Sequence, residues 1–449
     1  MPVVPYHITP EASINSLQYL NFEMASFLAS ILLLSLCVDG AHLQLKVLSR
    51  VDTVHSGLHQ RIRADGVAKA SVQSTPSNLP LIQVCAGSGG DMCLDAFKCS
   101  ATTSMDSCRL VALDTGSGNL WMMASECTNC VGDKDSFYNA SKSKCHSYLK
   151  QGISLLEGNQ PGFFKVERAE EADTTTIQYA TGDMHGVLSR DTIKIAGGFC
   201  IMQDFISVEG TNSPEVFSGF SGIAGLGFQD IDFESTPQWF DTMVNQGLIS
   251  EPLFFFATDS SGQESLILGK PANFESYFED FSKAISMPVV ETSWWSTEFK
   301  GLKMIYPDGT ETTLVNEETC AEHAKQNGIG CKLTFDSGSS QSTLPSDIYK
   351  QFKCLHGTKL RFEINQGEFF EQVFSDADSR DGCSHLGKLD IFGDGPLFLM
   401  GRPLFRQYTI VFQKDLEDNS KSSILVGNAA KPKDEKSLLQ SIRSKLQPN

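Results

Sequence analysis

Two stretches of the chain repeat one pattern: LVALDTGS at residues 110–117 and KLTFDSGS at residues 332–339. Each begins as an apolar strand and ends in an aspartate, a hydroxyl residue, a glycine and a serine. Each is followed, later in the chain, by two apolar residues and a glycine, at residues 223–225 and 399–401. A single Asp-Thr-Gly is typical of an ordinary turn. Two copies in matching context instead indicate a duplicated half that brings two equivalent loops together.

The repeated loops carry the residue types that peptide-bond hydrolysis needs. Hydrolysis without a metal or a covalent intermediate takes a base to activate water and an acid to protonate the substrate. Two carboxyls close together in a poorly solvated cleft resist losing both protons, so that one stays an acid while its neighbour is a base. We therefore predict that Asp114 and Asp336 are the catalytic pair. Glycines that allow close backbone approach and hydroxyls that orient the carboxyls have predicted supporting roles: Thr115, Gly116, Ser117, Ser337, Gly338 and Ser339.

The motifs around these loops are similar to those of the pepsin, cathepsin D and plasmepsin family of two-lobed aspartic proteases. Asn119-Leu120-Trp121 follows the first loop, and Tyr179-Ala180-Thr181-Gly182 resembles the family's flap. The resemblance extends from residue 110 to residue 429. It implies a mainly β, bilobal pepsin-like acid protease fold, with the active-site cleft between two lobes related by a pseudo-twofold axis.

The resemblance also assigns residues to substrate binding, with Tyr179 closing over the substrate. Asp183 stands where the flap tip is commonly Ser or Gly. Three apolar residues are pocket candidates, and core packing is the alternative for each, because aromatic side chains are usually core. The predicted flap and substrate-binding set is Trp121, Tyr179, Thr181, Gly182, Asp183, Trp294 and the pocket candidates Phe217, Phe220 and Ile223.

Two departures from the family pattern concern the second loop. Arg402 follows the second apolar-apolar-glycine, where many relatives have Asp. An Arg near Asp336 would favour its ionised form, lower the pKa of the pair and shift substrate preference towards acidic side chains; a surface Arg is the alternative. The interval from Asp336 to Gly401 is also much shorter than that from Asp114 to Gly225. This difference predicts a shortened C-terminal lobe.

Short β-rich runs broken by Gly, Ser and Asp predict a mainly β body. Examples are residues 109–113, 266–268 and 409–412. Helices are expected at residues 236–246, stopped by Gly247, and at residues 346–352.

Composition and charge divide the chain into five expected segments. Residues 1–40 read as a leader and signal peptide, with Met24 as an alternative start, because their apolar run is too short to span a bilayer. Residues 41–80 carry five Lys or Arg against two Asp in a chain of net charge −18. They are predicted to be a basic propeptide held on an acidic body. The remaining segments are the N-terminal lobe at 81–280, the shortened C-terminal lobe at 281–430 and a basic tail at 431–449.

Cysteine usage indicates an oxidising compartment. Of 13 cysteines, Cys37 lies in the expected signal peptide, which leaves an even number for disulfides. The resemblance implies the pairs Cys320–Cys331 and Cys354–Cys383. Cys127 is expected to pair with Cys130 or Cys145, and the other partners stay open. A zinc or redox site at Cys127 and Cys130 is disfavoured, because a metal site usually needs a second spaced pair.

The sequence thus predicts an aspartic endopeptidase, made as a zymogen, that is secreted or held in an acidic, lysosome-like vesicle. A glycosylation sequon at Asn139 agrees with passage through the secretory pathway. Protein or peptide substrates are the expected partners of a monomer, without cofactor, metal or stable membrane anchor, and the acidity argues against nucleic acid. Two alternatives stay open: a catalytically inactive family member that binds peptides, and a cysteine-rich extracellular adhesion module, which does not explain the repeated loops.

Overall fold

The computed structural model of the protein describes the greater part of one structural unit, residues 65–449. The predicted signal peptide, most of the predicted propeptide and the basic tail lie outside the described residues. So do Thr181, Cys354 and Cys383. The described residues are 67–74, 79–87, 107–149, 174–179, 182–195, 199–231, 236–258, 264–291, 293–352, 355–374, 385–389 and 397–430.

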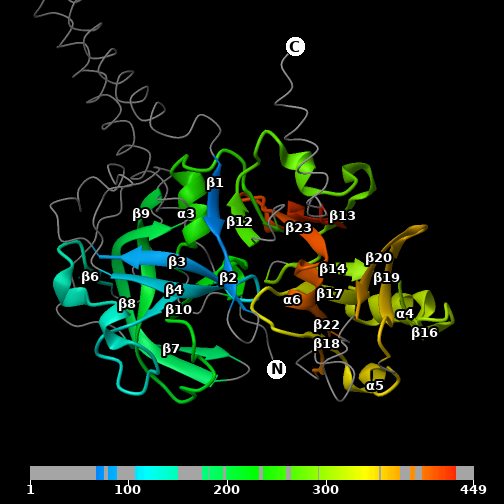
Figure 1. The fold of residues 1–449 in the computed structure, drawn as a ribbon, viewed down its shortest axis with the longest axis horizontal. Coiled ribbons are helices and arrows are strands. Elements are labelled where there is room, and N and C mark those ends of the chain that lie inside the picture. Colours follow the sequence, from blue (N-terminus) through cyan, green and yellow to red (C-terminus); the bar gives the residue numbers. More distant parts are fainter. Residues whose placement is uncertain are drawn as a thin grey trace, which may run out of the picture. The chain divides into compact units, whose positions relative to one another are not determined.

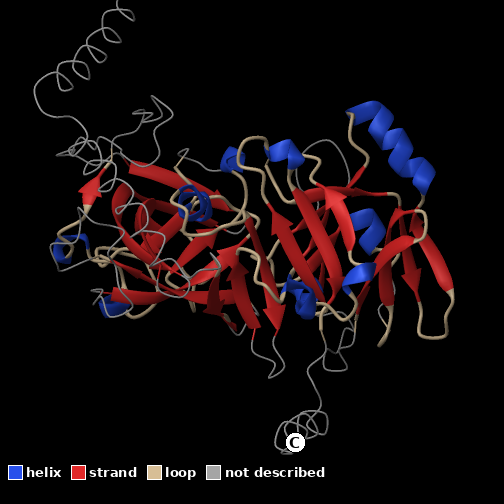
Figure 2. Cartoon of the chain, turned by 90° about the horizontal axis from the view of Figure 1, so that it is seen from above, coloured by secondary structure: helices blue, strands red, loops and turns tan. Residues whose placement is uncertain are grey.

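Strands dominate these residues (Figure 2), which confirms the predicted mainly β fold. The first repeated loop belongs to a nine-stranded sheet, ordered β2-β3-β4-β10-β5-β9-β8-β6 with β7 paired to β8. Its strands are β2 (Gln73–Ser74), β3 (Pro80–Ala86), β4 (Ser107–Asp114), β5 (Leu120–Met123), β6 (Ser147–Tyr148), β7 (Thr174–Tyr179), β8 (Gly182–Ile195), β9 (Phe199–Thr211) and β10 (Gly222–Gly225).

The second repeated loop belongs to a five-stranded sheet, ordered β14-β17-β22-β18-β21. A four-stranded sheet, ordered β16-β15-β19-β20, is formed by residues of the same half of the chain. The strands of the five-stranded sheet are β14 (Ser296–Phe299), β17 (Cys331–Phe335), β18 (Ser342–Leu344), β21 (Leu386–Lys388) and β22 (Leu397–Met400). Those of the four-stranded sheet are β15 (Gly301–Ile305), β16 (Glu311–Val315), β19 (Lys359–Asn365) and β20 (Glu368–Val373).

The duplication read from the sequence appears as one strand arrangement built twice. In the first half β4 runs parallel to β10, with Asp114 opposite Gly225. In the second half β17 runs parallel to β22, with Phe335 opposite Met400. A third strand, β5 or β18, pairs antiparallel to β10 or β22 respectively. The second half therefore contains the same arrangement of strands around its repeated loop.

A six-stranded sheet joins the two halves, ordered β1-β12-β11-β23-β24-β13. β11 of the first half pairs with β23 of the second, so that Phe254 lies opposite Phe412. At one edge β1, from the predicted propeptide, pairs with β12 (Figure 1). The strands are β1 (Ala68–Ser71), β11 (Leu253–Thr258), β12 (Glu264–Leu268), β13 (Ile285–Pro288), β23 (Tyr408–Gln413) and β24 (Ser423–Asn428).

Aromatic residues fill the core beneath the two catalytic loops. Phe254 and Phe412 are fully buried and stack on each other, and Trp295 packs against both. Phe228 lies against the other side of the same indole, 4.4 Å between ring centroids. Burial of such large side chains contributes about 1.5–3 kcal/mol each, so this cluster holds the two halves together.

The helices of the described residues are short. α3 (Trp239–Asn245) buries Trp239, Phe240 and Met243 on one face, and it ends before Gly247, which has a φ of 69°. This matches the helix and stop signal read from the sequence. α5 (Ser346–Tyr349) occupies the start of the second predicted helix, and α6 (Arg402–Phe405) follows β22. No helix in the described residues is long and apolar enough to cross a membrane.

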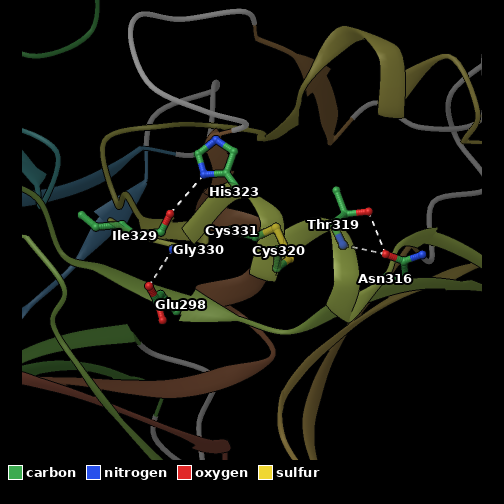
Figure 3. Close-up of a disulfide and its surroundings, with 8 residues drawn as sticks. All are labelled: Glu298, Asn316, Thr319, Cys320, His323, Ile329, Gly330 and Cys331. Atoms are coloured by element: carbon green, nitrogen blue, oxygen red, sulfur yellow. Dashed lines mark hydrogen bonds between the residues drawn. A yellow bond between two sulfur atoms is a disulfide. The ribbon is translucent and has the colours of Figure 1, made fainter. Parts of the chain in front are cut away.

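α4 (Glu317–Asn327) was not predicted from the sequence, because most of its side chains are polar and exposed. Asn316 caps its first turn by accepting from Thr319, and Gly328, with a φ of 79°, ends it. The Cys320–Cys331 disulfide joins the first part of this helix to the start of β17 (Figure 3), which confirms that predicted pair. A Glu298 carboxylate oxygen accepts from the Gly330 N–H at 2.7 Å beside it.

The first half also contains the disulfides Cys85–Cys108 and Cys127–Cys130, and Cys145 and Cys200 are disulfide-bonded as well. Cys127 pairs with Cys130, one of its two expected partners, and this bond is inconsistent with a zinc site there. Cys85 pairs with Cys108 and joins β3 to β4. Among the described residues no group of three or more His, Cys, Asp or Glu is placed to hold a metal ion. The predicted pair Cys354–Cys383 lies outside the described residues.

Candidate active site

The two repeated loops meet at the junction of the two halves. Asp114 is the last residue of β4, and Asp336 follows β17 directly. The Thr115 hydroxyl donates to the Phe335 carbonyl at 2.8 Å and accepts from the Ser337 N–H at 2.9 Å. The Ser337 hydroxyl makes the mirror-image contacts, donating to the Leu113 carbonyl at 2.9 Å and accepting from the Thr115 N–H at 3.1 Å. Both hydroxyl residues are fully buried, so these four bonds fix the two loops together.

Each of the two aspartate carboxyls is held by its own loop in the same way. The Gly116 N–H and the Ser117 hydroxyl donate to the two oxygens of Asp114, at 2.8 and 2.7 Å. In the second loop the Gly338 N–H and the Ser339 hydroxyl donate to Asp336 at the same two distances. The six supporting residues predicted from the sequence therefore all contact the pair or link its loops.

The glycines of the two loops pack against the opposite carboxyl. A Cβ placed on Gly116 would lie 2.7 Å from Oδ1 of Asp336, and one on Gly338 would lie 2.2 Å from Oδ1 of Asp114. Both distances are shorter than any real Cβ contact, so only glycine fits at either position. This close approach places the two carboxyls side by side.

The Asp114 carboxyl has a strongly raised pKa. Burial disfavours its charged form, the charge of Asp336 adds to the effect, and together they raise the pKa of Asp114 to about 8. The hydrogen bonds from Ser117 and Gly116 act in the opposite direction and are outweighed. The raised pKa means that Asp114 holds its proton at acidic and neutral pH.

The predicted flap is a hairpin of β7 and β8, and its described residues lie over an aromatic cluster. The Trp121 indole N–H donates to the Tyr179 hydroxyl at 2.7 Å. Phe217 packs against both rings, 5.7 and 5.9 Å between ring centroids. Phe220 lies 6.5 Å from the Trp121 ring, and Ile223 belongs to the same apolar cluster. The structure thus brings five predicted substrate-binding residues together, and their contact with substrate stays a prediction.

Asp183 lies beside the turn of the flap hairpin, next to Gly182 and opposite Gln178. Its backbone N–H donates to the Asn212 side-chain oxygen at 2.8 Å, and its carboxylate accepts from the Asn212 amide at 2.9 Å. Gly182 is packed against Ser213, where a Cβ would lie 2.4 Å from the Ser213 Cβ. The flap is therefore tied on this side to the turn after β9.

Two tryptophans behind the loops were not predicted as site residues. The Trp239 indole donates to the Gly225 carbonyl, and the Trp295 indole donates to the Leu226 carbonyl, both at 2.7 Å. These bonds fix the peptide that lies beside Asp114. Trp294, the predicted site residue, is only half-buried. The Trp294-Trp295 dipeptide was a visible signal, but nothing in the sequence distinguished the core residue from its neighbour.

Arg402 corrects both sequence readings of that position. Its side chain is fully buried, so the surface alternative is wrong, and its guanidinium pairs with the carboxylate of Glu264 on β12. The pKa of Asp114 is raised rather than lowered, so the predicted lowering is also wrong for that member of the pair. Glu264 was not predicted, because it lies 138 residues away in sequence.

Asn139, the predicted glycosylation site, caps a short 3-10 helix (Ala140–Lys142). Its side-chain oxygen accepts from the N–H and the hydroxyl of Ser141, at 3.1 and 2.7 Å. The residue is partly exposed. Its modification stays a prediction.

Comparison with known proteins adds independent evidence. A family model described as eukaryotic aspartyl protease matches residues 105–370. Cyprosin of Cynara cardunculus is 32% identical over 240 residues, which cover 51% of this chain and 41% of that one. Vacuolar protease A of Neurospora crassa is 28% identical over 253 residues, covering 56% and 52%. Aspartic proteinase A3 of Arabidopsis thaliana is 30% identical over 249 residues, covering 53% and 40%. The chain thus matches about half the length of these curated relatives, or somewhat less.

Proposed function

Because the chain belongs to the eukaryotic aspartyl protease family, we propose that it hydrolyses peptide bonds with a water molecule held between Asp114 and Asp336. One observation carries the proposal: two carboxyls from separate halves lie side by side, each oriented by a glycine N–H and a serine hydroxyl. A solely structural turn does not require this arrangement twice.

The two carboxyls would divide the proton transfers between them. Asp336 takes a proton from the water as its oxygen attacks the carbonyl carbon, while Asp114 gives its proton to the carbonyl oxygen. The tetrahedral diol then breaks down: Asp336 protonates the leaving nitrogen, and Asp114 recovers a proton from one hydroxyl. Both carboxyls return to their starting states. The raised pKa of Asp114 supports its assignment as the group that begins protonated.

The flap and the aromatic cluster beside it are the proposed substrate-binding elements. Tyr179 is held over the cluster by the Trp121 indole, and Phe217, Phe220 and Ile223 offer an apolar surface for a substrate side chain. Apolar pockets with a few polar groups are typical of such sites. Asp183 and the half-buried Trp294 are proposed contacts for the substrate on either side.

The proposed setting is an acidic, vacuole-like or lysosome-like compartment reached through the secretory pathway. Two observations support it: relatives named vacuolar protease A match half of the chain, and the first half contains the disulfides Cys85–Cys108 and Cys127–Cys130. We further propose that the protein is made as a zymogen whose propeptide is residues 41–80. A chain that lacks residues 41–80 is expected not to refold to activity; equal activity would overturn the zymogen proposal.

Substitution of either catalytic residue tests the proposed hydrolysis. The full chain, after acidification, is expected to cleave casein and to be blocked by a statine-type inhibitor. Asp114→Asn and Asp336→Asn should each lower the rate by about 10³-fold or more, because each removes one proton-transfer group. Asp347→Asn, at an exposed position on α5, is the matched control and should cleave normally.

The same experiment separates the alternative of an inactive peptide-binding protein. A wild-type chain that binds the inhibitor but cleaves neither casein nor a peptide library would support binding alone. Cleavage that survives both substitutions would exclude the proposed mechanism.

A further inference from the structure

Arg402 is a charged side chain enclosed within the core beside the second catalytic loop. Its exposed fraction is 0%. The guanidinium pairs with Glu264 and lies over the rings of Phe256 and Phe405, 5.7 and 5.8 Å from their centroids. Burial of an unpaired guanidinium would cost several kcal/mol. The side chain is therefore held where it can pair with Glu264 and contact the two rings.

The backbone around Arg402 holds the Asp336 loop at both ends. The Asp336 N–H donates to the Met400 carbonyl, and the Arg402 N–H donates to the Ser339 carbonyl, both at 2.9 Å. Between them Gly401 is packed so closely that a Cβ would lie 2.2 Å from the Gln341 carbonyl oxygen. A shift of residues 400–402 would therefore move the loop that carries the second carboxyl.

The side chain of Arg402 connects this backbone to a different sheet. Glu264 is the first residue of β12, which belongs to the six-stranded sheet that joins the two halves, whereas Met400 ends β22 of the five-stranded sheet. The ion pair is thus a side-chain link between the second catalytic loop and the central sheet. In the first half the matching position is Leu226, which has no charge and is held instead through its carbonyl by Trp295.

We propose that Arg402 is a positioning residue for Asp336, with Glu264 as its fixed counter-ion. The expected effect of Arg402 on kcat rests on the proposed hydrolysis. The expected effect on the structure of the Asp336 loop does not. The Arg402–Glu264 ion pair holds residues 400–402 in place. These residues in turn set the position and orientation of the Asp336 carboxyl opposite Asp114. Misplacement of a reacting group by about 1 Å can lower a rate by about 100-fold.

Kinetics of charge-removing variants in the full, acid-treated chain measure this role. A statine-type inhibitor titrates the active sites, so that kcat refers to folded enzyme only, and a quenched peptide from a casein digest is the substrate. Arg402→Met is expected to lower kcat by about tenfold or more while KM changes by less than about threefold. Arg402→Lys keeps the charge and should recover part of the loss. Glu264→Gln should lower kcat in the same direction by a smaller factor.

Amide hydrogen exchange gives a readout that does not depend on catalysis. In Arg402→Met and Glu264→Gln, peptides that cover residues 336–342 are expected to exchange faster than in the wild type. The matched control is Arg190→Met, which breaks the buried Arg190–Asp204 pair between β8 and β9. This control should speed exchange in β8 and β9 and leave exchange at residues 336–342 unchanged.

The outcomes separate this inference from the proposed function. Unchanged kcat and unchanged exchange at residues 336–342 in Arg402→Met would overturn the positioning role. If that variant does not fold, Glu264→Gln decides by the same two measurements. A wild-type chain that cleaves nothing would overturn the proposed hydrolysis. Even then, faster exchange at residues 336–342 in the variants would support the structural link to Glu264, and unchanged exchange would overturn it.

Discussion

The loops around Asp114 and Asp336 make the same hydrogen bonds to their carboxyls but are supported differently from behind. In the first half the Gly227 N–H donates to the Ser117 carbonyl at 2.8 Å. The matching residue in the second half is Pro403, which has no N–H, and the Arg402 N–H donates to Ser339 instead. The Trp239 and Trp295 indoles hold the peptide behind the first loop. The ion pair of Arg402 holds the peptide behind the second loop. The comparison teaches that the chemistry constrains the contacts to the carboxyls, whereas the supports behind them can differ.

Among the tests of this comparison, the largest expected effect comes from the glycines that face the opposite carboxyl. Gly116→Ala and Gly338→Ala should each lower kcat/KM by about 100-fold or more, because the new methyl group would displace a catalytic carboxyl. The loss should be greater for Gly338, whose Cβ would lie closer to its carboxyl. Gly210→Ala is the control, since no atom lies within 4 Å of the Cβ position there. Equal, small losses in all three variants would show that the two loops are not packed as described.

The pH dependence of stability should be dominated by the first loop. Asp114 has a pKa of 3.8 as a free group and about 8 when folded, so the folded chain binds the extra proton between these values. The free energy of unfolding should therefore fall as pH rises from about 4 to about 8. Urea denaturation at several pH values measures the slope, and Asp114→Asn should flatten it. A slope that persists in Asp114→Asn would assign the effect to other groups.

The reciprocal hydroxyl bonds test whether the two halves contribute equally to their junction. Thr115→Val and Ser337→Ala should each lower the free energy of unfolding by about 1–3 kcal/mol, since each leaves a buried N–H without its acceptor. Denaturation of the double variant should show less than the sum of the two losses, because the residues share bonds. Losses that differ severalfold between the single variants would contradict the symmetry of this contact.

The smallest effect is expected at the flap, which belongs to the first half. Tyr179→Phe removes the acceptor of the Trp121 indole N–H, and one hydrogen bond contributes about 0.5–1.5 kcal/mol. Measured kcat/KM should therefore fall by up to about tenfold, with little change in unfolding. A fall as large as that of Gly338→Ala would indicate that Tyr179 takes part in the reaction itself and not only in substrate binding.

The repeated motif was sufficient to predict that Asp114 and Asp336 come together with the six residues that support them, because each contact is made within a loop or between two copies of one pattern; their catalytic role stays a prediction. The Arg402–Glu264 pair could not be predicted, since the sequence does not reveal which buried charges meet across two sheets. Trp295 was missed for a related reason: its partner, the Leu226 carbonyl, is a backbone atom of the other half. α4 was missed because it has little apolar periodicity, although its cap residues Asn316 and Gly328 were visible signals.

The Cys320–Cys331 disulfide has a consequence for how this protein can change. It joins Cys320, within α4, to Cys331, the first residue of the strand that leads to Asp336, and so closes the segment of residues 321–330 (Figure 3). Because the cross-link fixes both ends, residues added or lost between them leave the register of the catalytic strand intact. The segment is thus a site where evolution, or a protein engineer, can vary length and surface without altering the active site. An affinity tag or a new binding loop would be best inserted there.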